Sequence, residues 1–412
     1  MLELLIQGAR IPQEERLVDV GVEGGSIVYL APSGAYASEA AETVWAEGKL
    51  LLPGLVEPHI HLDKAHLLPR MGREASSLRE AIRITAQMKA GFTKEDMKER
   101  SLAVLRQAVS NGVTHMRCHA EVDPILGLSG FETAMELKEE MQRFLDLQVV
   151  VFPQEGIFQS HGTEELMEEA LRQGGDVVGG VPYQDSDADR HIDFVFRLAD
   201  RFGVPADFHA DFSDNPEDRT ILTIADRTIA YGMQGHVAAG HVTSLGSMKY
   251  DDACRAAERV AEAGISVMSL PATDLFINGR GDPEKQRRGL TPVRLLQDRG
   301  VNVAVGVNNV RNAFTPFGKA DPLEVAWLLA VTSYMGGKED MERLIGMLTT
   351  GAARALGLRN YGMRVGAQAD FVLWPAATER DVILDRPESR TVWKRGVKVA
   401  ETTTKSLLYF GS

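Results

Sequence analysis

The sequence predicts an α/β protein built around a (β/α)8 TIM barrel, with a small β-sandwich domain formed from both termini. Three observations lead to this prediction. Eight short apolar segments rich in β-branched residues recur through the middle of the chain, helical patterns separate them, and glycine-punctuated alternating stretches occupy both ends. Eight such units in about 250 residues favour a closed barrel over an open sheet.

The two ends of the chain share a pattern that the middle lacks. Apolar and polar residues alternate around glycines before residue 54 and again after residue 364, which is typical of short strands joined by turns. We therefore expect residues 1–53 and 365–412 to form one small β domain. Residues 54–364 are expected to form the barrel.

The barrel strands follow from the apolar runs. They are predicted at 54–62, 113–122, 147–154, 177–182, 205–211, 236–242, 265–271 and 301–308. Helices are expected between them, for example over 101–112, 162–175 and 251–264. Several of these helices end in a glycine just before the next strand, which is a common helix C-cap.

The composition of the chain limits which kinds of molecule it is expected to bind. A formal net charge of −13 over 412 residues argues against a nucleic-acid binder, which usually carries a basic face. Two cysteines are too few for a disulfide framework, which favours a reducing cytoplasmic setting. The chain shows neither a signal-peptide pattern nor an apolar run long enough to cross a membrane. We expect a cytoplasmic protein that acts on a small molecule.

Polar residues gather at the carboxyl ends of the predicted strands, where barrel enzymes place their chemistry. Residues i and i+2 of a strand share a face, so His59 and His61 are both expected to point into the barrel mouth. An isolated His-x-His pair is a weak signal. Four histidines on three strand ends, however, predict metal or substrate chemistry, because a catalytic ion needs about three protein ligands and a water. The strand-end residues are His59, His61, His119, Glu121, Gln154, Glu155, His209, Asp211, His241, Asn308 and Asn309.

The stretches "LLPGLVEPHIHLDK", "DFHADFSDN", "AAGHVTSL" and "VNVAVGVNNV" resemble the amidohydrolase superfamily, in the branch that contains cytosine deaminase and N-isopropylammelide amidohydrolase. The resemblance runs over essentially the full length. It implies that His59, His61 and His209 bind one divalent metal ion, with Zn or Fe expected first and Mn or Ni as alternatives. It also implies that His241 contacts the metal-bound water or the substrate, and that Gln154 hydrogen-bonds a flat heterocycle.

Two positions depart from the pattern of that branch. The last barrel strand there ends in a metal-binding aspartate, and here Asn308 takes its place; an amide cannot act as a carboxylate base. Three residues after the fifth-strand histidine the branch carries an acid, and here Phe212 stands. Asp211 is our first candidate for the missing proton carrier, with Asp214 and Glu121 as alternatives. Each of the three could instead hydrogen-bond a ligand histidine.

Further substrate contacts are expected around the mouth. His119, Asn309 and Phe314 are candidates, and Phe317 is expected to join Phe314 in an aromatic wall. The glycine-rich stretch 271–292 is expected to form a loop over the mouth. Its candidates for substrate contact are Asp274, Arg280 and Arg287. For Arg287, however, a solvated surface side chain is the favoured interpretation. Asp63 and Lys64 are open to two interpretations, a surface pair or a part of the site.

The function expected from these features is hydrolysis of a C–N bond, by deamination or by amide or ring opening, in a small heterocyclic or amide substrate with a metal-activated water. Two alternatives stay open. The same barrel could run a metal-independent hydrolase, lyase or isomerase reaction, or the chain could be a catalytically degenerate ligand-binding homologue. A homo-oligomer is expected by analogy alone.

Overall fold

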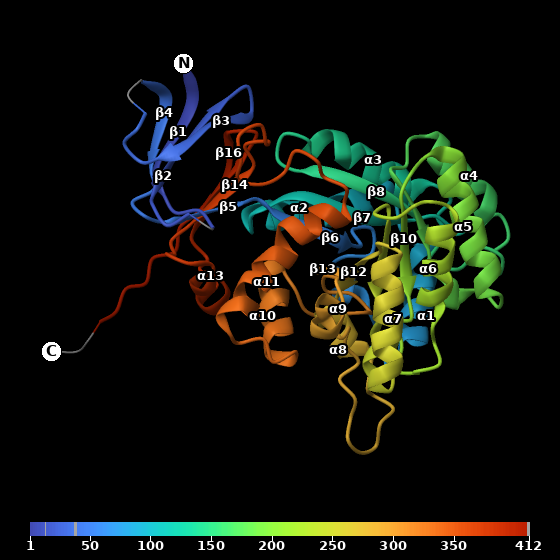
Figure 1. The fold of residues 1–412 in the computed structure, drawn as a ribbon. Helices are drawn as coiled ribbons and strands as arrows, with labels where there is room; N and C mark the ends of the chain where they lie inside the picture. Colours follow the sequence, from blue (N-terminus) through green and yellow to red (C-terminus); the bar gives the residue numbers. More distant parts are fainter. Residues whose placement is uncertain (13, 37–38, 410–412) are drawn as a thin grey trace.

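The computed structural model describes residues 1–12, 14–36 and 39–409 and confirms the predicted barrel. Eight parallel strands follow one another around it in sequence order (Figure 1). Each lies within or next to one of the predicted apolar runs. The strands are β6 (Leu55–Ile60), β7 (Val113–Glu121), β8 (Asp146–Phe152), β9 (Val177–Gly180), β10 (Ala206–Ala210), β11 (Val237–His241), β12 (Ser266–Ser269) and β13 (Asn302–Val305).

The barrel closes between its first and last strands. The His61 N–H donates to the Asn308 carbonyl, and the Asn308 N–H donates to the His59 carbonyl, both at 2.9 Å. The buried Glu57 carboxyl reinforces this seam, since it accepts from the backbone N–H groups of His59 and Val307. The seam therefore holds the two predicted metal ligands of β6 against Asn308.

Helices surround the barrel and connect its strands. The longer ones are amphipathic and bury one face against the sheet, as expected for helices around a parallel barrel. The helices of the described chain are α1 (Leu78–Lys89), α2 (Lys94–Ser110), α3 (Ser129–Met141), α4 (Thr163–Arg172), α5 (Ala188–Phe202), α6 (Thr220–Ala230), α7 (Tyr250–Glu262), α8 (Pro271–Ile277), α9 (Val293–Asp298), α10 (Pro322–Thr332), α11 (Lys338–Leu348), α12 (Thr350–Ala355) and α13 (Glu379–Asp385). The 3-10 turns are η1 (Leu68–Arg70), η2 (Pro182–Gln184) and η3 (Thr243–Ser247).

Both chain ends build the small β domain. One four-stranded sheet has the order β3-β2-β1-β4 and the other β16-β15-β14-β5. Apolar residues of both sheets, among them Ile6, Val20, Phe371 and Trp393, form a common core. The strands are β1 (Leu2–Ala9), β2 (Val18–Glu23), β3 (Ser26–Pro32), β4 (Ala40–Trp45), β5 (Leu50–Pro53), β14 (Phe371–Trp374), β15 (Arg390–Lys394) and β16 (Val397–Thr402). Domain boundaries at residues 53/54 and 364/365 stay a prediction.

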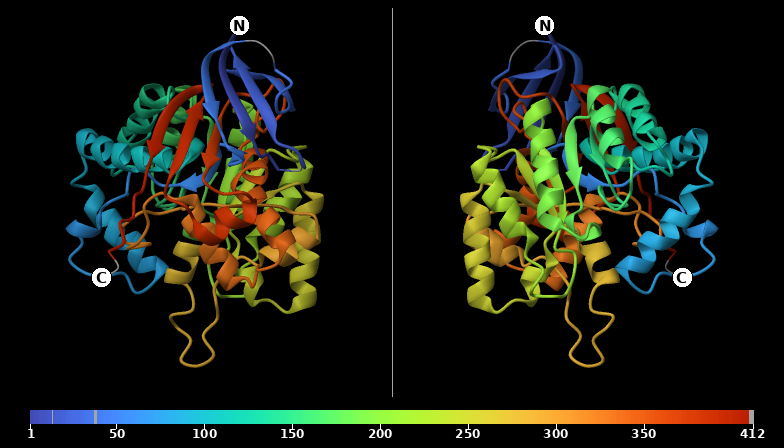
Figure 2. Two further views of the ribbon diagram at one scale, coloured as in Figure 1. Left: turned by 90° about the vertical axis from the view of Figure 1, so that its left-hand side faces the viewer. Right: turned by 90° about the vertical axis from the view of Figure 1, so that its right-hand side faces the viewer.

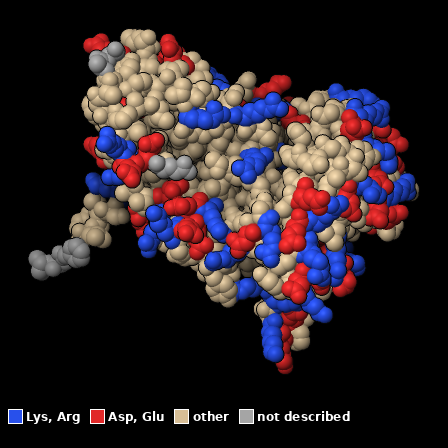
Figure 3. Space-filling model, in the orientation of Figure 1, with Lys and Arg blue, Asp and Glu red and all other residues tan. Residues whose placement is uncertain are grey.

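The small domain and the barrel mouth lie at opposite ends of the molecule. Figure 2 shows the blue and red β domain at one end and the gold loop that follows α8 at the other. A single glycine, Gly54, joins β5 to β6, and a Cβ atom there would lie 2.2 Å from the Thr114 hydroxyl oxygen. Among the described residues, we find no helix that is both long and apolar enough to span a bilayer. Acidic and basic side chains intermingle over the barrel on the face in Figure 3.

Candidate functional site

The three predicted metal ligands meet at the mouth end of the barrel. The Nε2 atoms of His59 and His61 each lie 3.0 Å from Nε2 of His209. All three side chains are buried. His59 belongs to β6, His61 follows it, and His209 belongs to β10 on the other side of the barrel. The two-residue spacing in β6 therefore does place both imidazoles on one face.

The chemistry of this donor set fits a divalent ion. Burial, reinforced by neighbouring histidines, holds the pKa of each of these three imidazoles well below its ordinary value, and Lys64 adds to the effect at His59 and His61. Neutral imidazoles offer the lone pairs that a metal requires, and nitrogens bound to zinc lie about 2.0–2.1 Å from it. The Asn308 Oδ1 atom, from the other side of the barrel seam, is also buried and lacks a hydrogen-bond partner within the described part of the chain.

His119 lies in the same cluster, where a ring nitrogen falls within 4.8 Å of ring nitrogens of His59 and His209. Its ring centroid is 4.0 Å from that of His59, and its Nε2 lies 3.4 Å from Oδ1 of Asp207. Asp207 precedes His209 by two residues on β10 and also pairs with Arg117 at 2.8 Å. The side chains of Arg117 and Asp207 therefore form the layer below the three ligands. This position favours a supporting role, or a fourth ligand, over the substrate contact that the sequence predicts for His119.

His241, at the end of β11, is held from two sides. Its Nδ1 lies 2.6 Å from Oδ1 of Asp274, and its ring stacks on Phe212 with centroids 3.8 Å apart and planes inclined by 9°. Asp274 is fully buried, so it serves His241 and not the substrate contact considered from the sequence. Because Nδ1 donates to this carboxylate, Nε2 of His241 is left as the acceptor.

Asp211 has a different environment from the one expected of a proton carrier. Its Oδ1 accepts from the backbone N–H and the hydroxyl of Thr220, and its Oδ2 accepts from the Ile221 N–H. These bonds cap the first turn of α6, whose own N-cap residue, Arg219, makes no side-chain cap. The contacts favour a structural role for Asp211 over the predicted catalytic one. Asp214 likewise accepts from the Gly279 N–H and holds a loop.

Gln154 and Lys64 meet in a buried polar network. Lys64 Nζ donates to Oε1 of Gln154 at 2.6 Å and to Oε1 of Glu121 at 2.8 Å. Asp63 accepts from the Glu121 N–H, and both Asp63 and Lys64 are buried. The interpretation of Asp63 and Lys64 as a surface pair is therefore wrong. Lys64 also lies 4.6 Å from the centroid of the Phe314 ring, so Phe314 does face the site.

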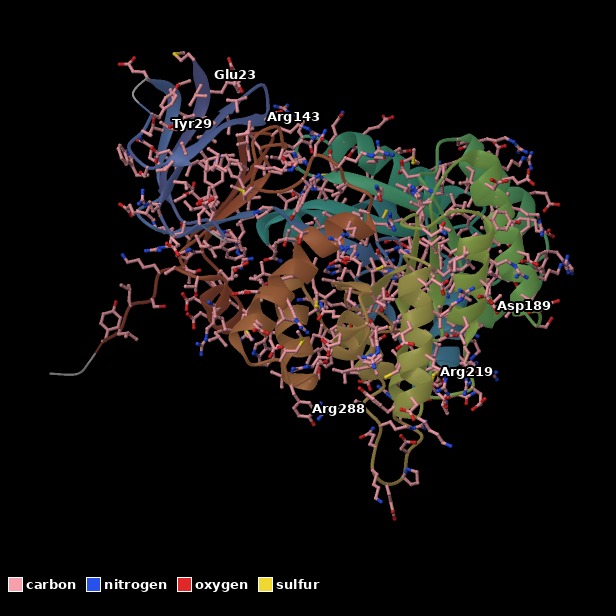
Figure 4. All side chains as sticks on the ribbon, in the orientation of Figure 1. Glu23, Tyr29, Arg143, Asp189, Arg219 and Arg288 are labelled. Atoms are coloured by element: carbon pink, nitrogen blue, oxygen red, sulfur yellow. The ribbon has the colours of Figure 1, made fainter. Side chains whose placement is uncertain are left out.

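The remaining candidates around the mouth either hold a loop or lie at the surface. Asn309 exchanges hydrogen bonds with Thr273 and Asn312, which occupies its amide in holding the loop after β13. Phe317 is 64% exposed, so the prediction of an aromatic wall on the site is wrong for this residue. Arg287 pairs with Asp282 at the surface. Its neighbour Arg288 contacts Tyr334, on the outside of the barrel in Figure 4.

A cavity of about 840 Å³ lies at the mouth end of the barrel. It is lined by α1, η2, the loop after β10 and the segment after α8, where Arg280 donates to the Ala75 carbonyl. Phe212 lines this cavity and also stacks on His241. It therefore lies between the cavity and His241.

Sequence reasoning missed three features of the site. Glu57 lies two residues before His59 on the same strand face, and burial raises its pKa to about 8; the period-2 alternation of β6 could have pointed to it. The pairing of Asp274 with His241 had no local signal, since 33 residues separate them. Lys89, at the end of α1, looked like an ordinary surface residue of an amphipathic helix.

The fold and the buried histidine set fit a barrel hydrolase, and the chain belongs to the amidohydrolase family, whose model matches residues 70–400. It is 26% identical to the N-isopropylammelide isopropyl amidohydrolase of Pseudomonas sp. (strain ADP), with 96% of each chain covered. It is 29% identical to the pterin deaminase of Rhizobium rhizogenes, over 95% of this chain and 90% of the relative. Among solved structures it is similar to the 5-methylcytosine deaminase of Klebsiella pneumoniae liganded with phosphonocytosine, with 29% identity, a TM-score of 0.93 and 98% and 100% of the two chains covered.

Proposed function

We propose that this protein is a metal-dependent hydrolase that cleaves a non-peptide C–N bond in a small nitrogen heterocycle. The observation that carries this proposal is the convergence of the His59, His61 and His209 Nε2 atoms beside His241. Family membership supports the class of reaction. Zn or Fe is proposed as the ion, with Mn or Ni as alternatives, because imidazole sites accept all of them.

His59, His61 and His209 would hold the ion, with Asn308 beside them as a weak oxygen donor. The ion would lower the pKa of a bound water and so supply a nucleophile near neutral pH. Phe212 leaves no acid at the position where the related branch carries one. His241 is therefore proposed to accept the water proton at Nε2 and to return it to the leaving nitrogen, while Asp274 holds its ring in the required tautomer.

The substrate class follows from the walls of the site. Phe314 and Phe212 offer aromatic surfaces, and Gln154 offers an amide at the edge of the site. The relatives named above act on an alkylated ammelide, on pterin and on 5-methylcytosine, all of them flat nitrogen heterocycles. A small molecule of this class is proposed as the partner, in keeping with the net charge of −13. A cytoplasmic location and a homo-oligomeric state stay predictions.

The test combines metal analysis with a substrate panel. The purified protein is analysed for bound metal and assayed for release of ammonia or amine from N-isopropylammelide, pterin, cytosine and 5-methylcytosine. We expect about one divalent ion per chain, turnover of a panel member, loss of turnover on chelation, and recovery on adding the ion back. Replacement of His241 by Gln should lower kcat by about 100-fold or more.

Different results would decide against the proposal. Activity without bound metal, and unchanged by chelators, would favour the metal-independent alternative. Bound heterocycle without any hydrolysis would favour the degenerate ligand-binding homologue.

A further inference from the structure

Helix α1 covers the barrel mouth. It starts at Ser77, whose hydroxyl accepts from the Glu80 N–H, and its buried side includes Ala81 and Ile82. These residues form one apolar cluster with Phe212, Ile277 and Phe314, which follow strands β10, β12 and β13. Figure 1 shows α1 at the same end of the barrel as the loop between α8 and α9. The helix therefore forms a roof over the side of the histidine site that Phe212 and Phe314 line.

The last residue of α1 ties the roof to the barrel. Lys89 is 1% exposed, and its Nζ lies 2.5 Å from Oε2 of Glu121, 2.8 Å from Oδ2 of Asp123 and 2.7 Å from Oε1 of Glu155. Glu121 ends β7, Asp123 follows it, and Glu155 follows β8. One ammonium thus bridges three carboxylates that would otherwise repel one another. Lifting α1 would remove the ammonium from Asp123 and Glu155 and leave Glu121 paired with Lys64 alone, so the closed position is favoured.

Glu121 connects this lock to the predicted substrate-binding residue. Its second oxygen, Oε1, accepts from Lys64, and Lys64 in turn donates to Oε1 of Gln154. An ammonium has donors alone, so the Gln154 amide is fixed with its oxygen toward Lys64. Its Nε2 donor is the group that remains for a substrate.

We propose that Lys89 is a positioning residue that locks α1 over the site and, through Glu121 and Lys64, presents Gln154 as a hydrogen-bond donor. The proposal rests on the proposed function and adds a substrate requirement to it: the edge that meets Gln154 carries an acceptor, either a carbonyl oxygen or an unprotonated ring nitrogen. Lys89 touches neither substrate nor metal and acts through the chain of contacts.

Lys394 provides a matched control. It is likewise 1% exposed and pairs with two carboxylates, Asp370 at 2.6 Å and Asp146 at 2.8 Å. It lies in β15, in the small β domain, away from the mouth. Replacing either lysine by Met removes a buried ammonium, and only one of them connects to Gln154.

The experiment measures kcat, KM, metal content and hydrogen exchange of the peptide over residues 78–89 in wild type, K89M, K89R and K394M. For K89M we expect KM to rise at least 10-fold with kcat changed less than 3-fold, exchange of α1 at least 10-fold faster, and wild-type metal content. In K89R, both KM and the exchange rate of α1 should lie closer to their wild-type values than in K89M. K394M should leave KM and α1 exchange at wild-type values.

The outcomes separate this proposal from the proposed function. Hydrogen exchange requires no substrate, so wild-type exchange of α1 in K89M overturns the lock even if no panel compound is turned over. Equal effects of K89M and K394M on KM overturn the connection to Gln154. If K89M does not fold, K89R and Q154E carry the test. Q154E keeps an oxygen for Lys64 but lacks the donor, so an unchanged KM for this variant overturns the acceptor requirement.

Discussion

At the scale of single residues, His241 shows how its surroundings define a role. Asp274 holds Nδ1 of the ring, and Phe212 covers one ring face where the related branch carries an acid. The imidazole therefore keeps one orientation and one free nitrogen. With Asn308 in place of a carboxylate, His241 is the residue of the site to which we assign both proton-transfer steps.

Replacing Asp274 by Asn should remove the carboxylate that fixes the His241 tautomer, because an amide can donate to Nδ1 as well as accept from it. We expect kcat to fall about 10–100-fold with a smaller change in KM, because Asp274 acts on the proton carrier and not on the substrate. Steady-state kinetics with a panel substrate would measure this, with circular dichroism as the check on folding. A KM effect larger than the kcat effect would contradict the assigned role.

Replacing Asp211 by Asn gives the opposite expectation. The variant should lose about 1–2 kcal/mol of stability, because the amide offers one oxygen to the three donors at the start of α6. Turnover should stay within about 3-fold of wild type if proton transfer uses His241. Urea unfolding and kinetics measure the two effects. A large loss of turnover at wild-type stability would restore the catalytic role predicted from the sequence.

At the scale of elements, the ends of three barrel strands adopt an unusual backbone conformation. Asp211, His241 and Asn308 have φ of +49°, +70° and +64°, a region that non-glycine residues seldom enter. Each follows or ends a strand, where the chain must turn out of the barrel. Such conformations cost about 1–3 kcal/mol each and cluster at functional sites. The turns aim His241 and Asn308 at the ligand set.

Helix α5 provides a test of pH dependence at this scale. His191 is fully buried; its Nε2 accepts from the Val181 N–H at 2.8 Å, and its Nδ1 lies 2.7 Å from Asp185. Burial lowers the pKa of His191 below its ordinary value of 6.5. Below pH 6.5 the unfolded chain takes up a proton that the folded chain refuses, so the stability contributed by His191 decreases as the pH falls.

The difference between wild type and H191Q isolates this contribution. We expect wild type to be more stable than H191Q by about 1–3 kcal/mol at pH 7, and this advantage should shrink toward pH 5. Urea unfolding at pH 7, 6 and 5 would measure it, with H161Q, at an exposed histidine, as the control. An advantage that grows on acidification would contradict the assigned neutral state.

At the scale of the whole molecule, a buried ionic cluster joins the small β domain to the barrel. Lys394 and Arg395 of the β15–β16 hairpin contact Asp146 at the start of β8, and Lys394 also pairs with Asp370. The cluster lies at the end of the barrel opposite the mouth. It connects the sheet that contains β14, β15 and β16 to the barrel without contributing to the site.

Replacing Lys394 by Met should lower the free energy of unfolding by about 3 kcal/mol, because two carboxylates lose their buried partner. K398M, at a surface pair with Glu401, should change it by no more than about 0.5 kcal/mol. Urea denaturation of the two variants makes the comparison. Equal losses would mean that the Lys394 cluster contributes no more than an exposed ion pair.

Much of the protein could be predicted from local patterns. Eight apolar runs at regular spacing determine the barrel strands, since a strand buried on both faces must be apolar along its length. The alternation in β6 determines that His59 and His61 share a face, and the barrel rule predicts that His209 and His241 join them. These inferences need only the periodicity of a strand and the common edge of parallel strands.

Tertiary structure alone decided the partners of the charged residues. Asp211 and Asp274 are similar acids near strand ends, yet one caps α6 and the other orients His241. Lys89 has the pattern of a surface lysine, yet three carboxylates from other elements enclose it. The partners of Asp274 and Lys89 lie more than 30 residues away in the chain, so the role of each side chain depends on which groups folding brings within hydrogen-bond distance. The sequence by itself determined that the imidazoles lie together at the strand ends. The tertiary structure decided which side chains hydrogen-bond them and pack on them, and which residue is left to transfer protons.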